Sequence, residues 1–153
     1  MVAWNSSKQV IIEANMSRVY LTRRVTFSAA HRLWSDLLSV EENYKVYDKC
    51  ANPNGHGHNY ELEVTVCGEP DSHTGMVMNL TDMKQIINEH VIDAIDHKHL
   101  NYDVPWLEDV VPTAEILAIK FWERLESAFP PGLLYEVKLQ ETENNIATYR
   151  GRR

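Results

Sequence analysis

The fold is decided by one alternating stretch of the chain, His56-Gly57-His58-Asn59-Tyr60-Glu61-Leu62-Glu63-Val64-Thr65-Val66. From residue 59 to residue 66 the odd positions are polar and the even positions are apolar. A period of two is typical of a half-buried β-strand. Residues 19–29 alternate in a similar way, with apolar side chains at most odd positions. The sequence therefore predicts two strands that each have one buried face and one polar face, and the polar face should meet water or a wet interface.

The remaining segments place two helices between strands. Residues 79–95 carry apolar side chains at 3.6-residue spacing, and a second helix is expected over residues 113–129 with Thr113 as its N-cap. Helices grouped between antiparallel strands predict an α+β domain with both helices on one face of the sheet. The other expected elements are a short helix, a short strand and two closing strands at residues 39–47, 76–79, 134–142 and 146–150.

The length and composition fit one globular domain. The chain has 153 residues, of which 44% are hydrophobic and 24% charged. Its longest aliphatic run, residues 116–119, is far too short for a membrane span, and the first residues show no secretory signal, so a cytoplasmic protein is expected. The net charge of −7 argues against nucleic acid and anionic membranes as partners. The basic residues within 1–35 are either a solvated edge or a local contact for a compact anionic substrate.

Three histidines lie near the ends of the two alternating strands. His31 follows the first strand on its apolar register, and His56 and His58 lie two apart on the apolar register of the second. Residues i and i+2 of a strand point to the same side, so the three imidazoles should converge if the strands share a core. An isolated histidine is most often a surface or core residue. Three neutral histidines with one open position, however, are the ligand set of a catalytic zinc site.

The two cysteines, Cys50 and Cys67, are too few for a disulfide framework and are interpreted as free thiols. Cys50 lies six positions before His56. It is therefore either a fourth zinc ligand, which would make the site closed and structural, or a thiol beside the metal. A thiolate near a cation has a lowered pKa and acts as a base or a nucleophile. The sequence leaves both alternatives open, and it favours an inert role for Cys67.

Two acidic residues have a possible role in a site. Asp96 precedes His97, and a carboxylate next to an imidazole can orient a proton shuttle, although a histidine at a helix end is the commoner case. Glu141 falls on the apolar register of residues 134–142. A carboxylate on a buried face needs a partner, and the parallel N–H groups of a pterin or guanine edge would match it. Alternatively, the strand ends at Gln140 and Glu141 is solvated.

Five separated motifs resemble the 6-pyruvoyl-tetrahydropterin synthase family. The motifs occur in the family's order and with its spacing, and the likeness runs from about residue 18 to residue 151. The resemblance is carried by residues 23–33, 50–60, 75–80, 96–98 and 141–145.

The family resemblance implies a tunnelling fold, with an antiparallel four-stranded sheet and two helices on one face. Three subunits would close a β-barrel, and two trimers would form a homohexamer. Residues 18–153 would be a single synthase domain, preceded by an N-terminal extension at residues 1–17. The implied reaction converts 7,8-dihydroneopterin triphosphate to 6-pyruvoyl-tetrahydropterin, with elimination of triphosphate, in tetrahydrobiopterin biosynthesis. No external redox cofactor is involved.

The resemblance also implies roles for individual residues. The three histidines would hold Zn²⁺, which acts as a Lewis acid on the substrate's side-chain hydroxyls. Cys50 would be the general base, and Asp96 and His97 would complete its proton relay from a neighbouring subunit. Mg²⁺ would accompany the triphosphate. The pterin ring would be anchored by Glu141, with two further positions near its pocket at Thr113 and Glu115.

The chain departs from the family pattern at three places. It has Ala114 after Thr113 where paired threonines are usual, it has Thr26 where a serine is usual, and residues 1–17 match nothing. Two other functions remain as alternatives. One is a 6-carboxy-tetrahydropterin synthase, in which the cysteine generally lies closer to the paired histidines. The other is a non-catalytic, zinc-stabilised assembly module with Cys50 as the fourth ligand.

Overall fold

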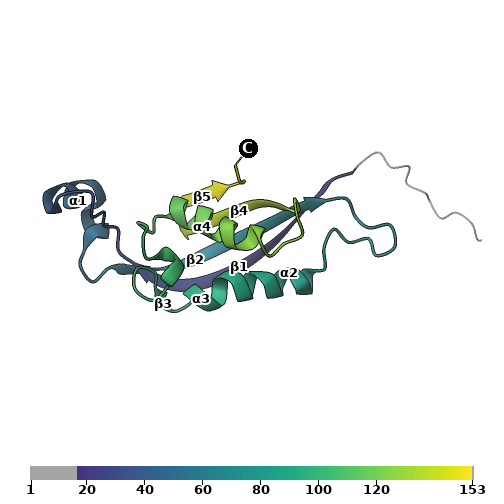
Figure 1. The fold of residues 1–153 in the computed structure, drawn as a ribbon, viewed down its shortest axis with the longest axis horizontal. Coiled ribbons are helices and arrows are strands. Elements are labelled where there is room, and N and C mark those ends of the chain that lie inside the picture. The colour runs from purple at the N-terminus through teal and green to yellow at the C-terminus, as the bar shows by residue number, and fades with distance from the viewer. Residues whose placement is uncertain (1–16, 153) are drawn as a thin grey trace, which may run out of the picture.

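The computed structural model describes residues 17–152 as an α+β unit built on one twisted sheet (Figure 1). Four strands pair antiparallel in the order β1-β2-β4-β5, and the two-residue strand β3 pairs parallel with β1 at the edge. The sheet therefore has five strands rather than the four expected. The strands are β1 Val19–His31, β2 His56–Gly68, β3 Lys98–His99, β4 Leu134–Thr142 and β5 Asn145–Tyr149.

Helices α2 and α4 pack on one face of the sheet, as expected, because side chains from both join a single core cluster with β1, β2 and β4. The first expected helix is interrupted: a π-helical turn at Asn88–Ile92 separates α2 from the short α3. Within that turn, the carbonyl of His90 accepts a hydrogen bond from Nε of Arg124 in α4, at 2.6 Å. The α-helices are α1 Val40–Tyr47, α2 Leu80–Ile87, α3 Asp93–Ile95 and α4 Ala114–Glu126.

Residues 76–79 are not a strand, so that prediction was wrong. They belong to a loop. In the turn before this loop, the carboxylate of Asp71 accepts hydrogen bonds from the backbone amides of His73 and Thr74. Asn79 then caps α2 by accepting from the amide of Thr81. These local side-chain bonds to the backbone satisfy groups that a strand would have paired with a neighbour.

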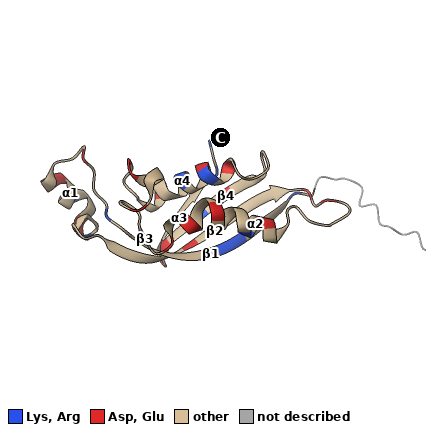
Figure 2. Cartoon of the chain, turned by 60° about the horizontal axis from the view of Figure 1, so that its bottom comes forward, with Lys and Arg blue, Asp and Glu red and all other residues tan. Residues whose placement is uncertain are grey.

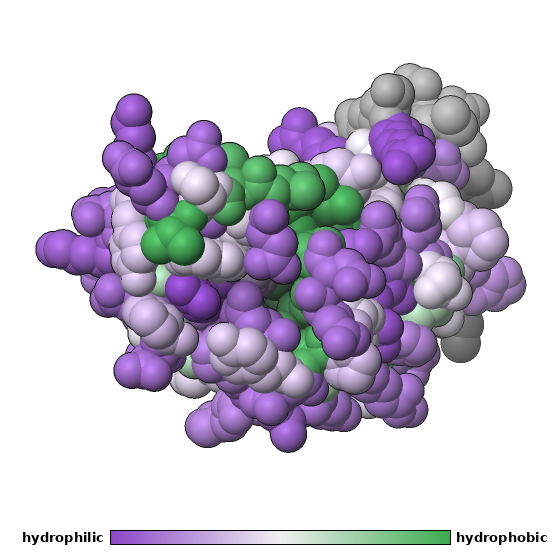
Figure 3. Space-filling view, turned by 60° about the vertical axis from the view of Figure 1, so that its left-hand side comes forward, coloured by the Kyte–Doolittle hydropathy of each residue, from purple (hydrophilic) through white to green (hydrophobic). Residues whose placement is uncertain are grey.

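Helix α1 lies on an arm that projects beyond the end of the sheet (Figure 1). Its start is a capping box, in which Ser39 and Glu42 each bond the other's backbone amide. The side-chain amide of Asn43, a fully buried residue, stabilises the arm by donating a hydrogen bond to the carbonyl of Ser35. Seen from this end, the surface shows apolar residues in a band bordered by hydrophilic ones (Figure 3). Exposed apolar residues on the arm include Leu37, Val40 and Val46.

The two faces of β1 and β2 differ as the alternation predicts. The face toward the helices carries the core, where Phe27 stacks on Tyr60 with ring centroids 4.7 Å apart. The opposite face carries polar pairs across the strands, such as Thr22 with Thr65 at 2.7 Å. On this face Glu63 bonds both a β1 arginine, at 2.8 Å, and Lys138 of β4, at 3.1 Å. Figure 2 shows the basic stretch of β1 in blue.

The described residues hold no helix that is both long and apolar enough to cross a membrane. The expected N-terminal extension lies outside the described residues, apart from its last residue, Ser17.

Candidate metal centre and active site

The three histidines converge at the end of the β1–β2 pair, as the register predicts. His31 pairs with His56, and His58 pairs with Ala29 two residues earlier on β1. Strand alternation therefore brings all three imidazoles to the helix-covered face. One ring nitrogen from each lies within 4.8 Å of the other two, and Nε2 of His31 is 3.1 Å from Nε2 of His56. This spacing leaves room for one metal ion between them.

His31 is held in one orientation by groups far along the chain. Its side chain is 1% exposed, and Nδ1 donates to the carbonyl oxygen of Pro112 at 2.8 Å. The Tyr60 hydroxyl lies 3.3 Å from the same nitrogen, and burial raises the pKa of that phenol, so it remains protonated. Burial lowers the pKa of His31 to about 4. His31 is thus a neutral imidazole whose Nε2 lone pair faces the other histidines, as a metal ligand requires.

The surroundings of His58 also indicate whether a metal ion fits the cluster. Its Nε2 is buried and has no hydrogen-bond partner within residues 17–152. A buried polar atom without a partner costs free energy unless something satisfies it. A cation bound by the three ring nitrogens would do so. A set of three imidazoles suits zinc, and the cluster leaves a further position open for substrate.

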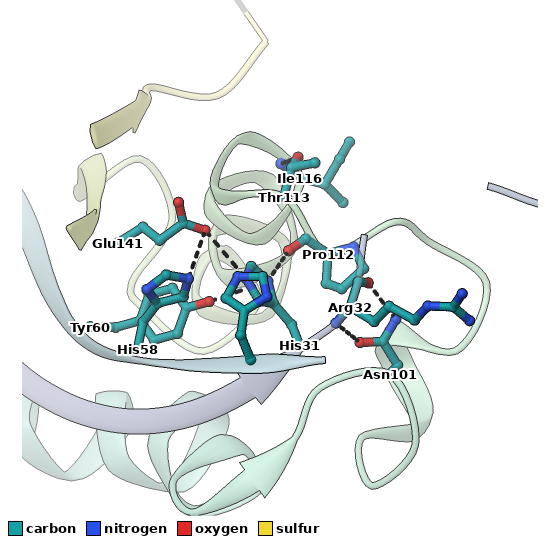
Figure 4. A network of polar contacts seen from close by, with 10 residues as sticks. His31, Arg32, His58, Tyr60, Asn101, Pro112, Thr113, Ile116 and Glu141 are labelled. Carbon is teal, nitrogen blue, oxygen red and sulfur yellow. Dashed lines mark hydrogen bonds and ion pairs between the residues drawn. The ribbon is translucent and has the colours of Figure 1, made fainter. Parts of the chain in front are cut away.

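Glu141 reaches this cluster from the end of β4 (Figure 4). The β4–β5 register shifts between Gln140 and Thr142, and the Glu141 side chain is only 17% exposed. Its Oε1 lies 3.5 Å from Nε2 of His31 and 3.9 Å from Nε2 of His58. The carboxylate therefore lies on the buried side, as its register predicts, and the solvated alternative is wrong.

Cys50 lies near the cluster but outside it. It belongs to the 3₁₀ turn Asp48–Ala51, and its carbonyl accepts from the amide of Leu33 at 2.9 Å. The group of ligand atoms within 4.8 Å contains the histidines and not this thiol. Burial, together with the nearby carboxylates of Glu141 and Asp48, raises the pKa of Cys50. This direction is opposite to the lowered pKa expected beside a cation, because burial, and after it the negative charges nearby, disfavour the thiolate. The geometry favours the free thiol over the fourth ligand.

Asp96 and His97 directly precede β3, the short strand at the edge of the sheet. Asp96 Oδ1 accepts from the Ser28 amide at 2.9 Å, and His97 Nδ1 lies 2.9 Å from the same oxygen. His97 has a φ of 60° and a side chain that is 81% exposed. Within residues 17–152 no hydrogen bond or ion pair joins either residue to Cys50 or the histidines. The pair predicted from the sequence exists, but one chain does not connect it to the metal centre.

Thr113 and Glu115, at the start of α4, differ in how close they lie to the site. Thr113 caps the helix by accepting from the amide of Ile116 at 3.3 Å, and it directly follows Pro112, the residue that orients His31 (Figure 4). Glu115 is exposed and makes no ion pair among the described residues. The structure therefore brings Thr113 to the site and leaves Glu115 at its margin.

A second layer of contacts around the site was missed by the sequence reasoning. Nε of Arg32 donates to the carbonyl of Ala51 at 2.9 Å, which ties the residue after His31 to the residue after Cys50. Asn101 accepts from the amide of Arg32 and donates to its carbonyl. Arg32 could have been suspected from its place beside His31. Asn101 and Pro112 carry no comparable signal.

Residues 20–152 match the protein family described as 6-pyruvoyl tetrahydropterin synthase. The 6-pyruvoyl tetrahydrobiopterin synthase of Homo sapiens is 53% identical over 131 residues, which are 86% of this chain and 90% of that protein. The corresponding protein of Pongo abelii is 54% identical over the same shares. A solved structure of Caenorhabditis elegans 6-pyruvoyl tetrahydropterin synthase is 43% identical, covers 90% of this chain and 98% of its own, and has a TM-score of 0.86.

Proposed function

Because the chain belongs to the 6-pyruvoyl tetrahydropterin synthase family and acts in tetrahydrobiopterin biosynthesis, we propose that it is a zinc-dependent lyase. Its substrate is 7,8-dihydroneopterin triphosphate, which loses triphosphate and rearranges to 6-pyruvoyl-tetrahydropterin. The observation that carries this proposal is the convergence of three imidazoles with a partly buried carboxylate in one site. The chain is proposed to work in the cytoplasm, with Mg²⁺ accompanying the triphosphate.

His31, His56 and His58 are the residues proposed to hold the zinc. When bound, zinc supplies a Lewis acid that polarises the substrate's side-chain hydroxyls and makes the adjacent C–H bonds more acidic. The Pro112 carbonyl keeps the proton of His31 on Nδ1, so that Nε2 remains available as a ligand. The deep burial of His31 keeps this ring neutral and excludes water from one side of the site.

Glu141 is proposed to bind the pterin ring. An ionised carboxylate accepts two parallel N–H bonds, which is the pattern that the amidine-like edge of a pterin offers. Its position beside His31 and His58 would hold the ring close to the metal and place the substrate's side chain over the histidines. Thr113, next to Pro112, is proposed to add a polar contact, with Glu115 at the outer edge of the pocket.

Cys50 is proposed to remove the proton, and Asp96 and His97 to complete its relay. Within the described residues of one chain, no hydrogen bond or ion pair joins the Asp96–His97 pair to Cys50. We therefore propose that the pair comes from a neighbouring copy in a homohexamer of two stacked trimers. The outer edges of β3 and β5 have no partner strand among the described residues, and such edges are suited to pairing with further copies.

The proposal is tested by product analysis. Zinc-loaded protein is incubated with 7,8-dihydroneopterin triphosphate, and the expected products are 6-pyruvoyl-tetrahydropterin and free triphosphate in equal amounts. A chelator should abolish both, and restored zinc should recover them. A 6-carboxy product would support the alternative enzyme. Full zinc loading without any product would support the assembly module.

A further inference from the structure

A cavity lies at the corner where β1, β2 and β3 meet. Its volume is about 480 Å³. The paired residues Ser28 and Asn59 belong to the polar face, opposite to the face that carries the three histidine side chains. The cavity is lined by Ser28, Ala29, Ala30, Gly57, His58, Asn59 and residues 97–99.

The lining presents hydrogen-bond donors that the chain itself does not use. Ser28 Oγ donates to Asn59 Oδ1 at 2.7 Å, and this bond leaves the amide nitrogen of Asn59 without a partner within residues 17–152. Lys98 makes no ion pair or hydrogen bond with its side chain in the described part of the chain. Nδ1 of His97 lies 2.9 Å from Asp96 Oδ1, and its other ring nitrogen has no partner in the part of the chain that the structure describes. An ammonium, an amide and an imidazole therefore remain available at one corner.

The composition of the lining selects among ligand classes. It includes no acidic residue, although the whole chain has 22 acidic against 15 basic residues. Two carboxylates next to the lining already have partners: Asp96 accepts from the Ser28 amide and lies 2.9 Å from His97 Nδ1, and Asp103 accepts from the His99 amide at 2.8 Å. The lining also includes no aliphatic side chain larger than alanine and no Phe, Tyr or Trp. Protein interfaces are centred on such apolar and aromatic anchors. Donors without acids or apolar anchors suit a small anion.

We propose that this cavity is an anion subsite that binds phosphate groups. Its ligand is either the triphosphate chain of the substrate or inorganic triphosphate after its release. The choice of triphosphate rests on the proposed function. Because the Ser28 and Asn59 side chains lie on the face opposite to the three histidine side chains, the phosphates and the metal-bound part of one substrate molecule would contact different copies of the chain.

Asn59→Asp is the sharpest variant. The substitution keeps an oxygen that accepts from Ser28, but it replaces the free amide donor with a negative charge. Lys98→Met keeps most of the side-chain length and removes the positive charge. Lys84→Met is the matched control, because Lys84 is an exposed lysine on α2 that makes no ion pair within residues 17–152 and does not line the cavity.

Calorimetric titration of the zinc-loaded protein with inorganic triphosphate measures the subsite without any turnover. We expect binding that weakens about tenfold or more in Asn59→Asp and in Lys98→Met, and that is unchanged in Lys84→Met. Wild-type affinity should also fall as salt is raised. Absence of triphosphate binding to the wild type, or equal binding by all variants, would overturn the subsite even if turnover is normal.

Substrate kinetics separate the two sources of phosphate. If the substrate's own triphosphate binds here, the KM rises about tenfold in both cavity variants, while binding of 7,8-dihydroneopterin, which lacks phosphates, stays the same. If only the released product binds here, the KM is unchanged and only inhibition by triphosphate weakens. Triphosphate binding without turnover would uphold the subsite and refute the proposed function. A change in solution mass in both cavity variants, with triphosphate binding unchanged, would give these residues a purely structural role between copies and overturn the subsite.

Discussion

The two faces of β1 and β2 carry opposite chemistry within a few residues of each other. On the helix-covered face, His31 is 1% exposed and burial lowers its pKa to about 4, so the site holds neutral ligand atoms. Beside Ser28, which belongs to the other face of β1, His97 is 81% exposed and its Nδ1 lies 2.9 Å from Asp96. A shift of one position along a strand is enough to move a side chain between these environments. Under the proposals above, one sheet would hold a metal on its buried side and exchange protons or bind anions on the other.

The buried face should be the more sensitive to mutation. His56→Ala is expected to reduce turnover below detection, because two imidazoles bind zinc much more weakly than three. The fold should survive, since His56 lies at the end of β2 and is only partly buried. Steady-state assays at a zinc concentration that just loads the wild type provide the measurement. His73→Ala, in an exposed turn, is the control and should keep normal activity.

Cys50→Ala is expected to lower the turnover rate by about 10²–10⁴-fold, which is the usual contribution of a positioned base. Zinc content and substrate binding should remain normal, because the thiol lies outside the group of ligand atoms. Cys67→Ala, at the far end of β2, is the control and should keep the rate. Loss of zinc and of structure in Cys50→Ala alone would instead make Cys50 a structural ligand.

Glu141→Gln tests the one carboxylate on the buried side of the site. The variant keeps the shape of the side chain but loses the charge that pairs with the pterin N–H groups. Substrate binding should weaken by about 1.5–3 kcal/mol, the usual value for a charged hydrogen bond, and the KM should rise about tenfold to a hundredfold. An unchanged KM would place Glu141 outside the pterin pocket.

Glu63→Gln gives the smallest expected effect, on the opposite face. Lys138 and a β1 arginine lower the pKa of Glu63, although partial burial opposes them. A lowered folded-state pKa stabilises the protein above the unfolded-state pKa, and this contribution is lost as pH falls through the folded-state value. The variant should therefore lose up to about 1 kcal/mol at pH 7. Its difference from wild type should vanish in acid, as measured by denaturant unfolding at several pH values.

The elements that the sequence predicted well are those with a repeated local pattern. The alternation of residues 58–66 sets β2, and its register places His56, His58 and their neighbours on the correct faces. Glu141 was predicted on the buried side for the same reason. Each of these inferences needed only the spacing of residues along one strand.

The missed features depend on contacts between distant parts of the chain. Pro112 orients His31 across 81 positions, and Asn101 bonds Arg32 across 69. Strand β3 has only two residues and exists because β1 offers an edge, so no periodicity could reveal it. The apolar residues 76–78 suggested a strand over residues 76–79, but the side-chain bonds of Asp71 and Asn79 fix a loop there. Local patterns carry no information about such pairings.

The central claim is that three histidines on the buried face hold zinc while Cys50 remains a free thiol. Zinc analysis of purified wild type, His31→Ala and Cys50→Ala tests it most directly. The account predicts stoichiometric zinc in the wild type and in Cys50→Ala, and loss of zinc in His31→Ala. Full zinc in His31→Ala, or loss of zinc in Cys50→Ala, would contradict it.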